Sequence, residues 1–432
     1  MKYQPPKGTQ DLWNEKFYAY DSIAKTILRV TEQYGFRQIR TPGFEPIEIL
    51  AKDAGNEVSG QIYTFKDKGG REFGIKSDIT PGVTRFVAGN GRPIPKPIKI
   101  SCYDRVYRYE RPQSGRNREV TQVNAEMYGV KSELADAELL ACFYQCYIEL
   151  GLPRVKIQLG FRPFLDRYIR LLGVSKKQIM PVIRLVDKRE KITDQEFTKE
   201  IIACGVSPNG LKKIKILIGF NGSLEKTLKN AQAIVGGDKQ LSKYLQWLNI
   251  ITNFLKKYGI DDRFQLNLGL ARGSEYYTGI IYEAKLPNSQ YGSIGGGGRY
   301  DNLVAQYGGP DTPAVGFSIG LDRIYPILQE TNKLQLTNKP KIDYYLATER
   351  DSISITSMIK CVQQLREKGQ NVEVDLQNKN MSEQLQAAKE LGSKKVILFK
   401  QALLKNNQVV LINLIENKEQ IIQVSDYDST IL

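Results

Sequence analysis

The segment from Val106 to Gly129 restricts the fold of this chain more than any other stretch. It reads VYRYERPQSGRNREVTQVNAEMYG. Two kinds of side chain alternate in the residues before the central loop and again in the residues after it. Alternation with period two predicts two strands. Arg108 and Glu110 are expected on one face of the first strand, and the returning strand places three polar residues on a single face: Gln122, Asn124 and Glu126.

The stretch between the two strands, residues 111–118, contains Pro112, Gly115 and three arginines, which is typical of a basic loop. A strand, a loop with arginines and a returning strand with fixed polar groups would suit an anionic, planar ligand. Taken alone, arginines on strands are more often solvated or paired, and alternating tyrosines usually fill a half-buried sheet.

A second cluster of arginine, carboxylate and tyrosine lies much later in the chain. It begins at Leu270 with LARGSEYYTGIIYE and is followed by GGGGRYD at residues 295–301. The glycines 295–298 are weak evidence for a phosphate-binding loop, and a close-packed turn explains them equally well.

Together these blocks resemble the histidyl-tRNA synthetases, a class II aminoacyl-tRNA synthetase family, and the resemblance covers almost the whole chain. The two arginine-containing blocks match the second motif of the class and the two stretches that distinguish histidine enzymes. Three further blocks fit in the same order: YGFRQIRTP at 34–42, KSDITP at 76–81 and PAVGFSIGLDR at 313–323. They resemble the first motif, which builds the dimer interface, the loop that holds the substrate ammonium, and the third motif.

The resemblance implies an α/β (α+β) fold with an antiparallel-sheet catalytic core over residues 1–327. Lysine-rich helical patterns at about 163–257 resemble the helical insertion of the family. Residues 328–340 are polar and aperiodic, which predicts a linker. Residues 341–432 begin with a βαβαβ pattern and resemble the α/β anticodon-binding domain. The segments after Phe399 depart from the family pattern, so anticodon contacts cannot be assigned to single residues.

The implied reaction attaches histidine to tRNA(His) through histidyl-adenylate, with ATP consumed as a substrate and Mg²⁺ bound to it. Histidine's own carboxylate is the nucleophile, so the step needs positioning and positive charge rather than a side-chain base. The resemblance assigns Arg108 and Arg272 to the α-phosphate as the catalytic pair. It assigns ATP binding to four residues: Arg108, Glu110, Arg116 and Arg323.

Histidine recognition requires acceptors for an ammonium group and an imidazole N–H. The resemblance assigns Asp78 and Thr80 to the ammonium and Glu126 to the imidazole. The full expected set for histidine is Asp78, Thr80, Gln122, Glu126, Arg272, Tyr276, Tyr277 and Tyr300. Lys76-Ser77-Asp78 stands where the family usually has Arg-Pro-Glu, so the carboxylate keeps its charge and loses reach. Gln113 is the expected tRNA contact.

Composition agrees with this interpretation. The net charge of +15 favours a polyanionic partner, although a lysine excess also arises from AT-rich coding. The absence of a long apolar run predicts no membrane segment and a cytoplasmic protein. The five cysteines are scattered, which argues against a disulfide framework. Cys142 and Cys146 lie one helical turn apart and could share a metal, but with no second cysteine pair and no histidine they are expected in a helix core.

The chain contains no histidine, which excludes every mechanism that relies on a protein imidazole. Drift, engineering, or an advantage in translating this enzyme when histidine is scarce would each explain the absence. The main alternative function is a non-catalytic, histidine-sensing regulatory paralogue in histidine biosynthesis, which usually lacks the C-terminal domain and the catalytic arginines. Another class II synthetase and an unrelated basic RNA-binding protein are more distant alternatives.

Overall fold

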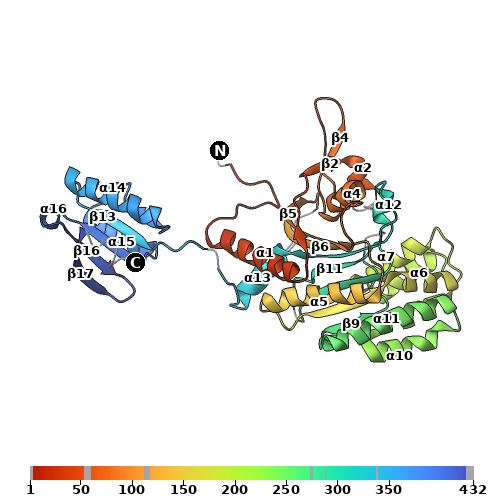
Figure 1. The fold of residues 1–432 in the computed structure, drawn as a ribbon. Coiled ribbons are helices and arrows are strands. Elements are labelled where there is room, and N and C mark those ends of the chain that lie inside the picture. The colour runs from red at the N-terminus through yellow and green to blue at the C-terminus, as the bar shows by residue number, and fades with distance from the viewer. Residues whose placement is uncertain are drawn as a thin grey trace. The chain divides into compact units, whose positions relative to one another are not determined.

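The computed structural model describes residues 3–52, 60–110, 117–272, 276–287, 289–336 and 339–424. The chain divides into two compact units, residues 1–337 and 338–432, and each is described by itself (Figure 1).

The first unit is built on a nine-stranded sheet with the order β1-β5-β6-β12-β11-β10-β7-β9-β8. The strands are β1 (Arg37–Gln38), β5 (Ile98–Tyr107), β6 (Glu119–Tyr128), β7 (Lys156–Phe161), β8 (Asn221–Ser223), β9 (Phe264–Asn267), β10 (Ile280–Lys285), β11 (Ser293–Arg299) and β12 (Ala314–Gly320). From β5 to β7 all neighbours are antiparallel, and the parallel pairs β1–β5 and β7–β9 lie toward the edges. The predicted antiparallel core is confirmed.

The two faces of this sheet have different surroundings, as the alternation of β6 shows. Val123, Ala125 and Met127 belong to the large apolar core beneath α1 (Glu15–Gln33), α5 (Glu133–Glu149) and α13 (Leu321–Glu330). The intervening polar residues of β6 therefore face the other side. There a smaller apolar cluster packs with α4 (Thr80–Asn90) and α12 (Leu303–Gln306).

Helix α5 is buried on nearly all sides, because apolar residues cover most of its circumference. The Ser132 hydroxyl accepts from the backbone N–H of Ala135 at 3.2 Å and caps the first turn. Cys142 and Cys146 are both buried in the core, as expected. Within the described residues no group of three or more His, Cys, Asp or Glu side chains could hold a metal ion.

Helices dominate the region between β7 and β9. They are α6 (Arg162–Leu171), α7 (Ile179–Asp187), α8 (Asp194–Ala203), α9 (Pro208–Ile218), α10 (Leu224–Val235) and α11 (Lys239–Lys257), with short 3-10 turns η1 (Arg189–Lys191) and η2 (Asp261–Arg263). Asp238 caps α11 by accepting from the N–H groups of Gln240 and Leu241 at 3.0 and 2.9 Å. The apolar faces of these helices join the same core as the sheet.

A small sheet precedes the polar loop at residues 76–79. It pairs β2 (Phe44–Pro46), β4 (Glu72–Ile75) and β3 (Thr64–Lys66), and α2 (Ile47–Ala51) follows β2. Its last strand leads directly into Lys76, whose ammonium group donates to the carboxylate of Asp104 on β5.

The second unit is a five-stranded sheet with the order β14-β13-β15-β16-β17 and two separate apolar clusters. Its elements are β13 (Tyr344–Thr348), α14 (Ser352–Glu367), β14 (Val372–Val374), α15 (Met381–Glu390), β15 (Lys395–Phe399), α16 (Gln401–Leu404), β16 (Gln408–Asn413) and β17 (Lys418–Gln423). Among the described helices of both units, none is long and apolar enough to cross a membrane.

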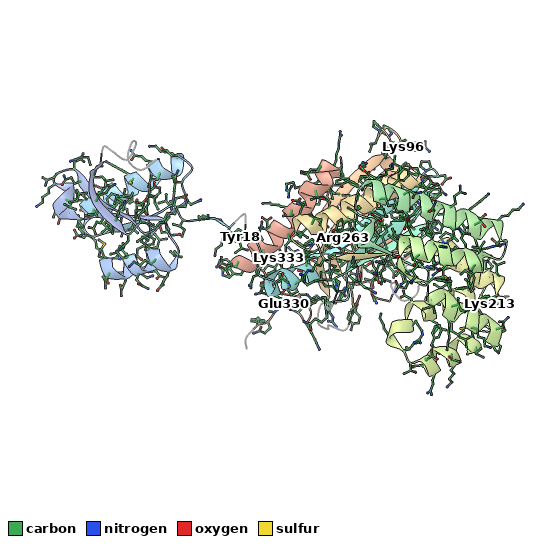
Figure 2. The ribbon with its side chains drawn as sticks, turned by 90° about the horizontal axis from the view of Figure 1, so that it is seen from below. Tyr18, Lys96, Lys213, Arg263, Glu330 and Lys333 are labelled. Carbon is green, nitrogen blue, oxygen red and sulfur yellow. The ribbon has the colours of Figure 1, made fainter. Side chains whose placement is uncertain are left out.

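Three local expectations were wrong. The first strand of the arginine-rich hairpin ends at Tyr107, because Tyr107–Glu119 is the last pair of the ladder, so Arg108 and Glu110 follow the strand. Glycines 295–298 form the middle of β11, not a turn. Finally, α13 continues to Glu330, and Lys333 is anchored to the carbonyl of Gly151 at 2.5 Å, so the ordered first unit extends into the range expected for the linker (Figure 2).

Candidate functional site

A buried carboxylate, Glu126, lies at the centre of the polar face of β6. One of its oxygens, Oε1, accepts from Thr80 Oγ1 at 2.7 Å and from Asn124 Nδ2 at 3.1 Å. The other oxygen, Oε2, accepts from the hydroxyl of Tyr300. Asn124 also donates to Thr80 Oγ1 at 3.2 Å, so the acceptor is held on both sides.

This surrounding changes the acidity of the carboxyl group. Burial raises the pKa of Glu126 to about 7, although hydrogen bonds from Tyr300, Thr80 and Asn124 act in the opposite direction. A group with such a pKa exchanges its proton near neutral pH. It can therefore accept a hydrogen bond from a ligand N–H with full negative charge only above that range.

A second carboxylate, Asp78, continues the polar network toward the end of β5. Gln122 Nε2 donates to Asp78 Oδ1 at 3.1 Å and to Asn124 Oδ1 at 2.9 Å. Arg108 Nη2 lies 3.5 Å from Asp78 Oδ2, and Arg108 Nε donates to the carbonyl of Ser77 at 2.9 Å. The structure thus brings Arg108, Asp78, Gln122 and Glu126 into one connected cluster.

Glycines on the neighbouring strands leave space for these side chains. Gly316 on β12 lies opposite Glu126 in the register, and a Cβ atom there would come within 1.5 Å of Glu126 Oε2. A Cβ on Gly298 of β11 would lie 2.7 Å from the ring of Tyr277, and one on Gly296 would lie 1.9 Å from Arg272 Nη1. These glycines form a bare sheet surface on which the site side chains rest.

Three tyrosine rings form one wall of the cluster. The rings of Tyr276 and Tyr277 are 4.7 Å apart, and Tyr276 meets Tyr300 edge to face at 5.7 Å. Tyr277 and Tyr300 are buried. Because Tyr300 also donates to Glu126, the aromatic wall and the buried acceptor share one residue.

Arg272 lies beside this wall in an unusual backbone conformation. Its φ is +49°, in the left-handed region that non-glycine residues rarely occupy. The guanidinium Nη1 donates to the carbonyl of Tyr282 at 2.9 Å. Burial lowers the pKa of Arg272, and the surrounding Tyr277, Glu283, Tyr276 and Asp187 outweigh that effect and raise it, so the group stays charged.

Two other expected ATP contacts lie around the same sheet. Arg323, at the start of α13, donates through Nη1 to the carbonyl of Ser293 on β11. Glu110 follows β5, where its N–H donates to the carbonyl of Arg108 at 2.8 Å. Arg116 and Gln113, expected to contact ATP and tRNA, lie outside the described residues.

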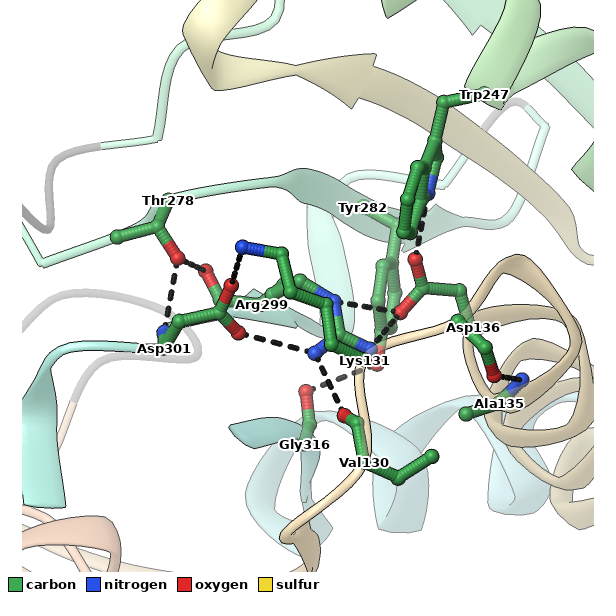
Figure 3. A network of polar contacts seen from close by, with 11 residues as sticks. Val130, Lys131, Ala135, Asp136, Trp247, Thr278, Tyr282, Arg299, Asp301 and Gly316 are labelled. Atoms are coloured by element: carbon green, nitrogen blue, oxygen red, sulfur yellow. Dashed lines mark hydrogen bonds and ion pairs between the residues drawn. The ribbon is translucent and has the colours of Figure 1, made fainter. Parts of the chain in front are cut away.

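Arg299, in the GGRYD stretch, points to the opposite face of the sheet from its neighbour Tyr300. Its Nε donates to Asp136 Oδ1 at 2.9 Å and its Nη1 to Asp301 Oδ1 at 3.0 Å, both in the interior (Figure 3). Trp247 of the helical insertion donates to Asp136 Oδ2 at 2.9 Å. This buried network connects α5 and α11 to the end of β11, directly before Tyr300.

Sequence reasoning missed three contributors. Asn124 was placed on the polar face of β6 but not in the site, although its alternation with Gln122 and Glu126 was the available signal. Gly316 and Arg299 contribute through contacts between distant strands and helices, and no local pattern reveals such contacts.

Comparisons with known proteins identify the family of the chain. The family model for histidyl-tRNA synthetase matches residues 8–324. The histidine–tRNA ligase of Pyrococcus abyssi is 36% identical over 89% of this chain and 88% of that protein. The ligase of Methanocaldococcus jannaschii is 31% identical over 99% of each chain. The crystal structure of a histidyl-tRNA synthetase from a Nostoc species superimposes with a TM-score of 0.80 at 26% identity, covering 99% of this chain and 98% of that one. The chain belongs to the histidyl-tRNA synthetase family.

Proposed function

We propose that the chain attaches histidine to tRNA(His) in an ATP-dependent reaction through histidyl-adenylate, with the Glu126 cluster as its histidine pocket. The observation that carries this proposal is the buried, hydrogen-bonded acceptor Glu126 beside three tyrosine rings. Thr80, Asn124 and Tyr300 occupy three of the about four acceptor sites of the carboxylate. A ring N–H would take the remaining site, so the pocket favours an amino acid that carries such a donor.

Histidine would bind with its imidazole N–H toward Glu126 and its ring against Tyr276, Tyr277 and Tyr300. Its ammonium group would lie near Asp78 and Thr80. Gln122 supports this orientation because it joins the two ends of the pocket by donating to Asp78 and Asn124.

ATP would bind where the positive charges lie, beyond the Asp78 end of the pocket. Arg108 is already paired with Asp78, so the α-phosphate and the substrate carboxylate would meet next to it. Glu110 would accept from the adenine amino group, and Arg323 would contact the nucleotide from α13. Arg116 has the same role by resemblance alone.

In the adenylation step, a carboxylate oxygen of histidine attacks the α-phosphorus and pyrophosphate leaves. Negative charge increases on the non-bridging oxygens during the attack, and preorganised cations stabilise it. We assign this task to Arg108 and Arg272, whose fork-shaped groups match phosphate oxygens. The 3′-terminal hydroxyl of tRNA then attacks the acyl carbon, and AMP is the leaving group.

Mg²⁺ would enter with ATP, held by the phosphate oxygens. We further propose that the chain works as a homodimer through residues 34–42 and that residues 341–432 bind the anticodon.

The test is ATP–pyrophosphate exchange with each amino acid in turn. Only histidine should support exchange, and tRNA(His) should then be charged. Exchange with another amino acid alone would contradict the assignment of the pocket. The regulatory alternative is not favoured, because the curated ligases match this chain along nearly their full length.

A further inference from the structure

A second carboxylate, Asp322, lies beside the hairpin of β5 and β6 and accepts several hydrogen bonds; we call it and its donors the hub. Asp322 stands in the first turn of α13, directly before Arg323. Its carboxylate is half-buried and accepts four hydrogen bonds. The donors are Thr121 N at 2.8 Å, Asn117 Nδ2 at 3.2 Å, Tyr20 Oη at 3.3 Å and Gln10 Nε2 at 3.4 Å.

These donors come from segments that are distant in sequence. Gln10 lies in the N-terminal segment, Tyr20 on α1, and Asn117 and Thr121 at the entry of β6. A carboxylate removed from water requires such partners, since burying it unpaired is costly. Asp322 therefore fixes the N-terminal segment, β6 and α13 at one point.

The N-terminal segment makes its own backbone contact with the hairpin. The carbonyl of Gly8 accepts from Arg118 N at 2.8 Å and from Glu119 N at 3.2 Å. Lys16 donates to the side-chain oxygen of Gln10, which orients the amide that reaches Asp322. The segment thus holds the returning arm of the hairpin by its main chain.

Arg118, which the N-terminal segment holds, in turn contacts the residues assigned to ATP. Its carbonyl accepts from Arg108 N at 2.8 Å, and its Nε donates to the carbonyl of Glu110 at 3.2 Å. Its guanidinium lies 4.8 Å from the ring centroid of Tyr109. Arg108 and Glu110, which follow the strand, are therefore held by the opposite arm.

We propose that Asp322 is a positioning residue for the ATP subsite. By joining the N-terminal segment to the entry of β6 and the start of α13, it sets where Arg108, Glu110 and Arg323 stand. The inference rests on the proposed function for the identity of that subsite. It deepens the proposal by assigning a role to residues 8–20, which reach Asp322 through Gln10 and Tyr20 and the hairpin through Gly8.

The hub and the histidine pocket use different groups. None of the four donors to Asp322 belongs to the set around Glu126, which consists of Thr80, Asn124 and Tyr300. Weakening the hydrogen bonds of Asp322 should therefore raise the KM for ATP more than the KM for histidine.

The experiment compares three variants of the full-length enzyme by ATP–pyrophosphate exchange, varying ATP and histidine separately. Asp322→Asn keeps the size and shape of the side chain. It replaces one carboxylate oxygen by an NH₂ group, which faces the hydrogen-bond donors of the hub and cannot accept from them. We expect the KM for ATP to rise about tenfold, as for loss of a hydrogen bond to a charged group, with the KM for histidine changed less than threefold. Tyr20→Phe should give a smaller shift in the same direction. Glu330→Gln is the matched control, because Glu330 is an exposed carboxylate at the other end of α13 that accepts from the Tyr291 hydroxyl, and it should leave both KM values unchanged.

The double variant provides a readout that general destabilisation would not produce. If Tyr20 acts through Asp322, adding Tyr20→Phe to Asp322→Asn should cause no further rise in the KM for ATP. Additive effects, equal rises in both KM values, or an unchanged KM for ATP in folded Asp322→Asn would overturn the proposal. If Asp322→Asn does not fold, Tyr20→Phe and Gln10→Ala decide it by the same ATP-specific shift. Failure of the wild type to depend on histidine would instead refute the proposed function.

Discussion

At the scale of single residues, the site relies on two kinds of charge. Glu126 is an acceptor whose burial makes its charge conditional on pH, whereas Arg272 keeps its charge because the surrounding tyrosines and carboxylates raise its pKa. A chain without histidine cannot use a protein imidazole for proton transfer, so we assign recognition and catalysis to Glu126, to the arginines Arg108 and Arg272, and to the substrate itself.

We predict that Glu126→Gln raises the KM for histidine and leaves the KM for ATP nearly unchanged. The penalty, measured as the ratio of variant to wild-type KM, should shrink as pH falls from 8 to 6. The reason is that burial raises the pKa of Glu126 to about 7, so the wild-type carboxyl takes up its proton in that interval and comes to resemble the amide. The imidazole of histidine has its ordinary pKa at about 6.5, so the change from pH 8 to 7 reports most directly on the carboxyl of Glu126. A penalty that stays constant over this range would contradict the proposed role.

Arg272 provides the residue-scale test of catalysis. Losing one preorganised donor of the transition state typically costs about 3 kcal/mol, or about a hundredfold in rate. Arg272→Ala should slow single-turnover adenylate formation by about that factor, and Arg272→Lys should restore little because the fork is lost. Transfer from preformed adenylate to tRNA should suffer less. Arg105→Ala is the control, since Arg105 is an exposed arginine on β5 paired with Glu119 at 3.3 Å. Near-normal adenylate formation by folded Arg272→Ala would make Arg272 a structural residue.

At the scale of elements, glycines on the strands of the sheet leave space for the side chains of the candidate site. Gly296 and Gly298 face the site from β11, and Gly316 faces it from β12, where Gly298 and Gly316 are paired in the register. Strands rarely contain so many glycines, because each weakens the strand and buries no side chain. Here the missing side chains give space to Arg272, Tyr277 and Glu126.

We therefore predict that Gly316→Ala damages the histidine pocket. The added methyl group would lie 1.5 Å from Glu126 Oε2, so the carboxylate must move and the KM for histidine should rise at least tenfold. Gly320→Ala is the matched control, because a Cβ atom at that end of the same strand meets nothing within 4 Å. Histidine kinetics and thermal unfolding of both variants would check this. Equal effects of the two substitutions would show that Glu126 adapts without loss.

The elements also show where prediction from sequence succeeds. Period-two alternation correctly placed Gln122, Asn124 and Glu126 on one face, because β6 is paired along its whole length. The same rule failed beyond Tyr107, where the ladder ends and Arg108 is fixed by Ser77 and Arg118 instead. Glycines 295–298 suggested a turn because glycine has low strand propensity. Pairing with β10 and β12 on both sides outweighs that preference, and such long-range pairing has no local signature.

At the scale of the whole molecule, the chain consists of two units with separate apolar cores. Every residue assigned to histidine or ATP lies in the first unit. The second unit has its own sheet with an apolar cluster on each face, so its folding does not require the site, and the site does not draw on its core.

This separation leads to the last prediction. A protein that ends at residue 337 should fold and form histidyl-adenylate at a rate close to that of the full chain, because the first core and the Glu126 cluster are intact. Charging of tRNA(His) at limiting tRNA should fall by at least tenfold, because the anticodon contacts that we assign to residues 341–432 are lost. The difference should appear in the KM for tRNA and not in the KM for histidine. Residues 338–432 added as a separate protein at equal concentration should not restore charging. In the full chain the covalent link between the two units raises the effective concentration of the second unit at the bound tRNA, and this advantage is lost when the units are separate. If the folded, shortened protein charges tRNA(His) normally, the second unit has another task and the anticodon assignment must be abandoned.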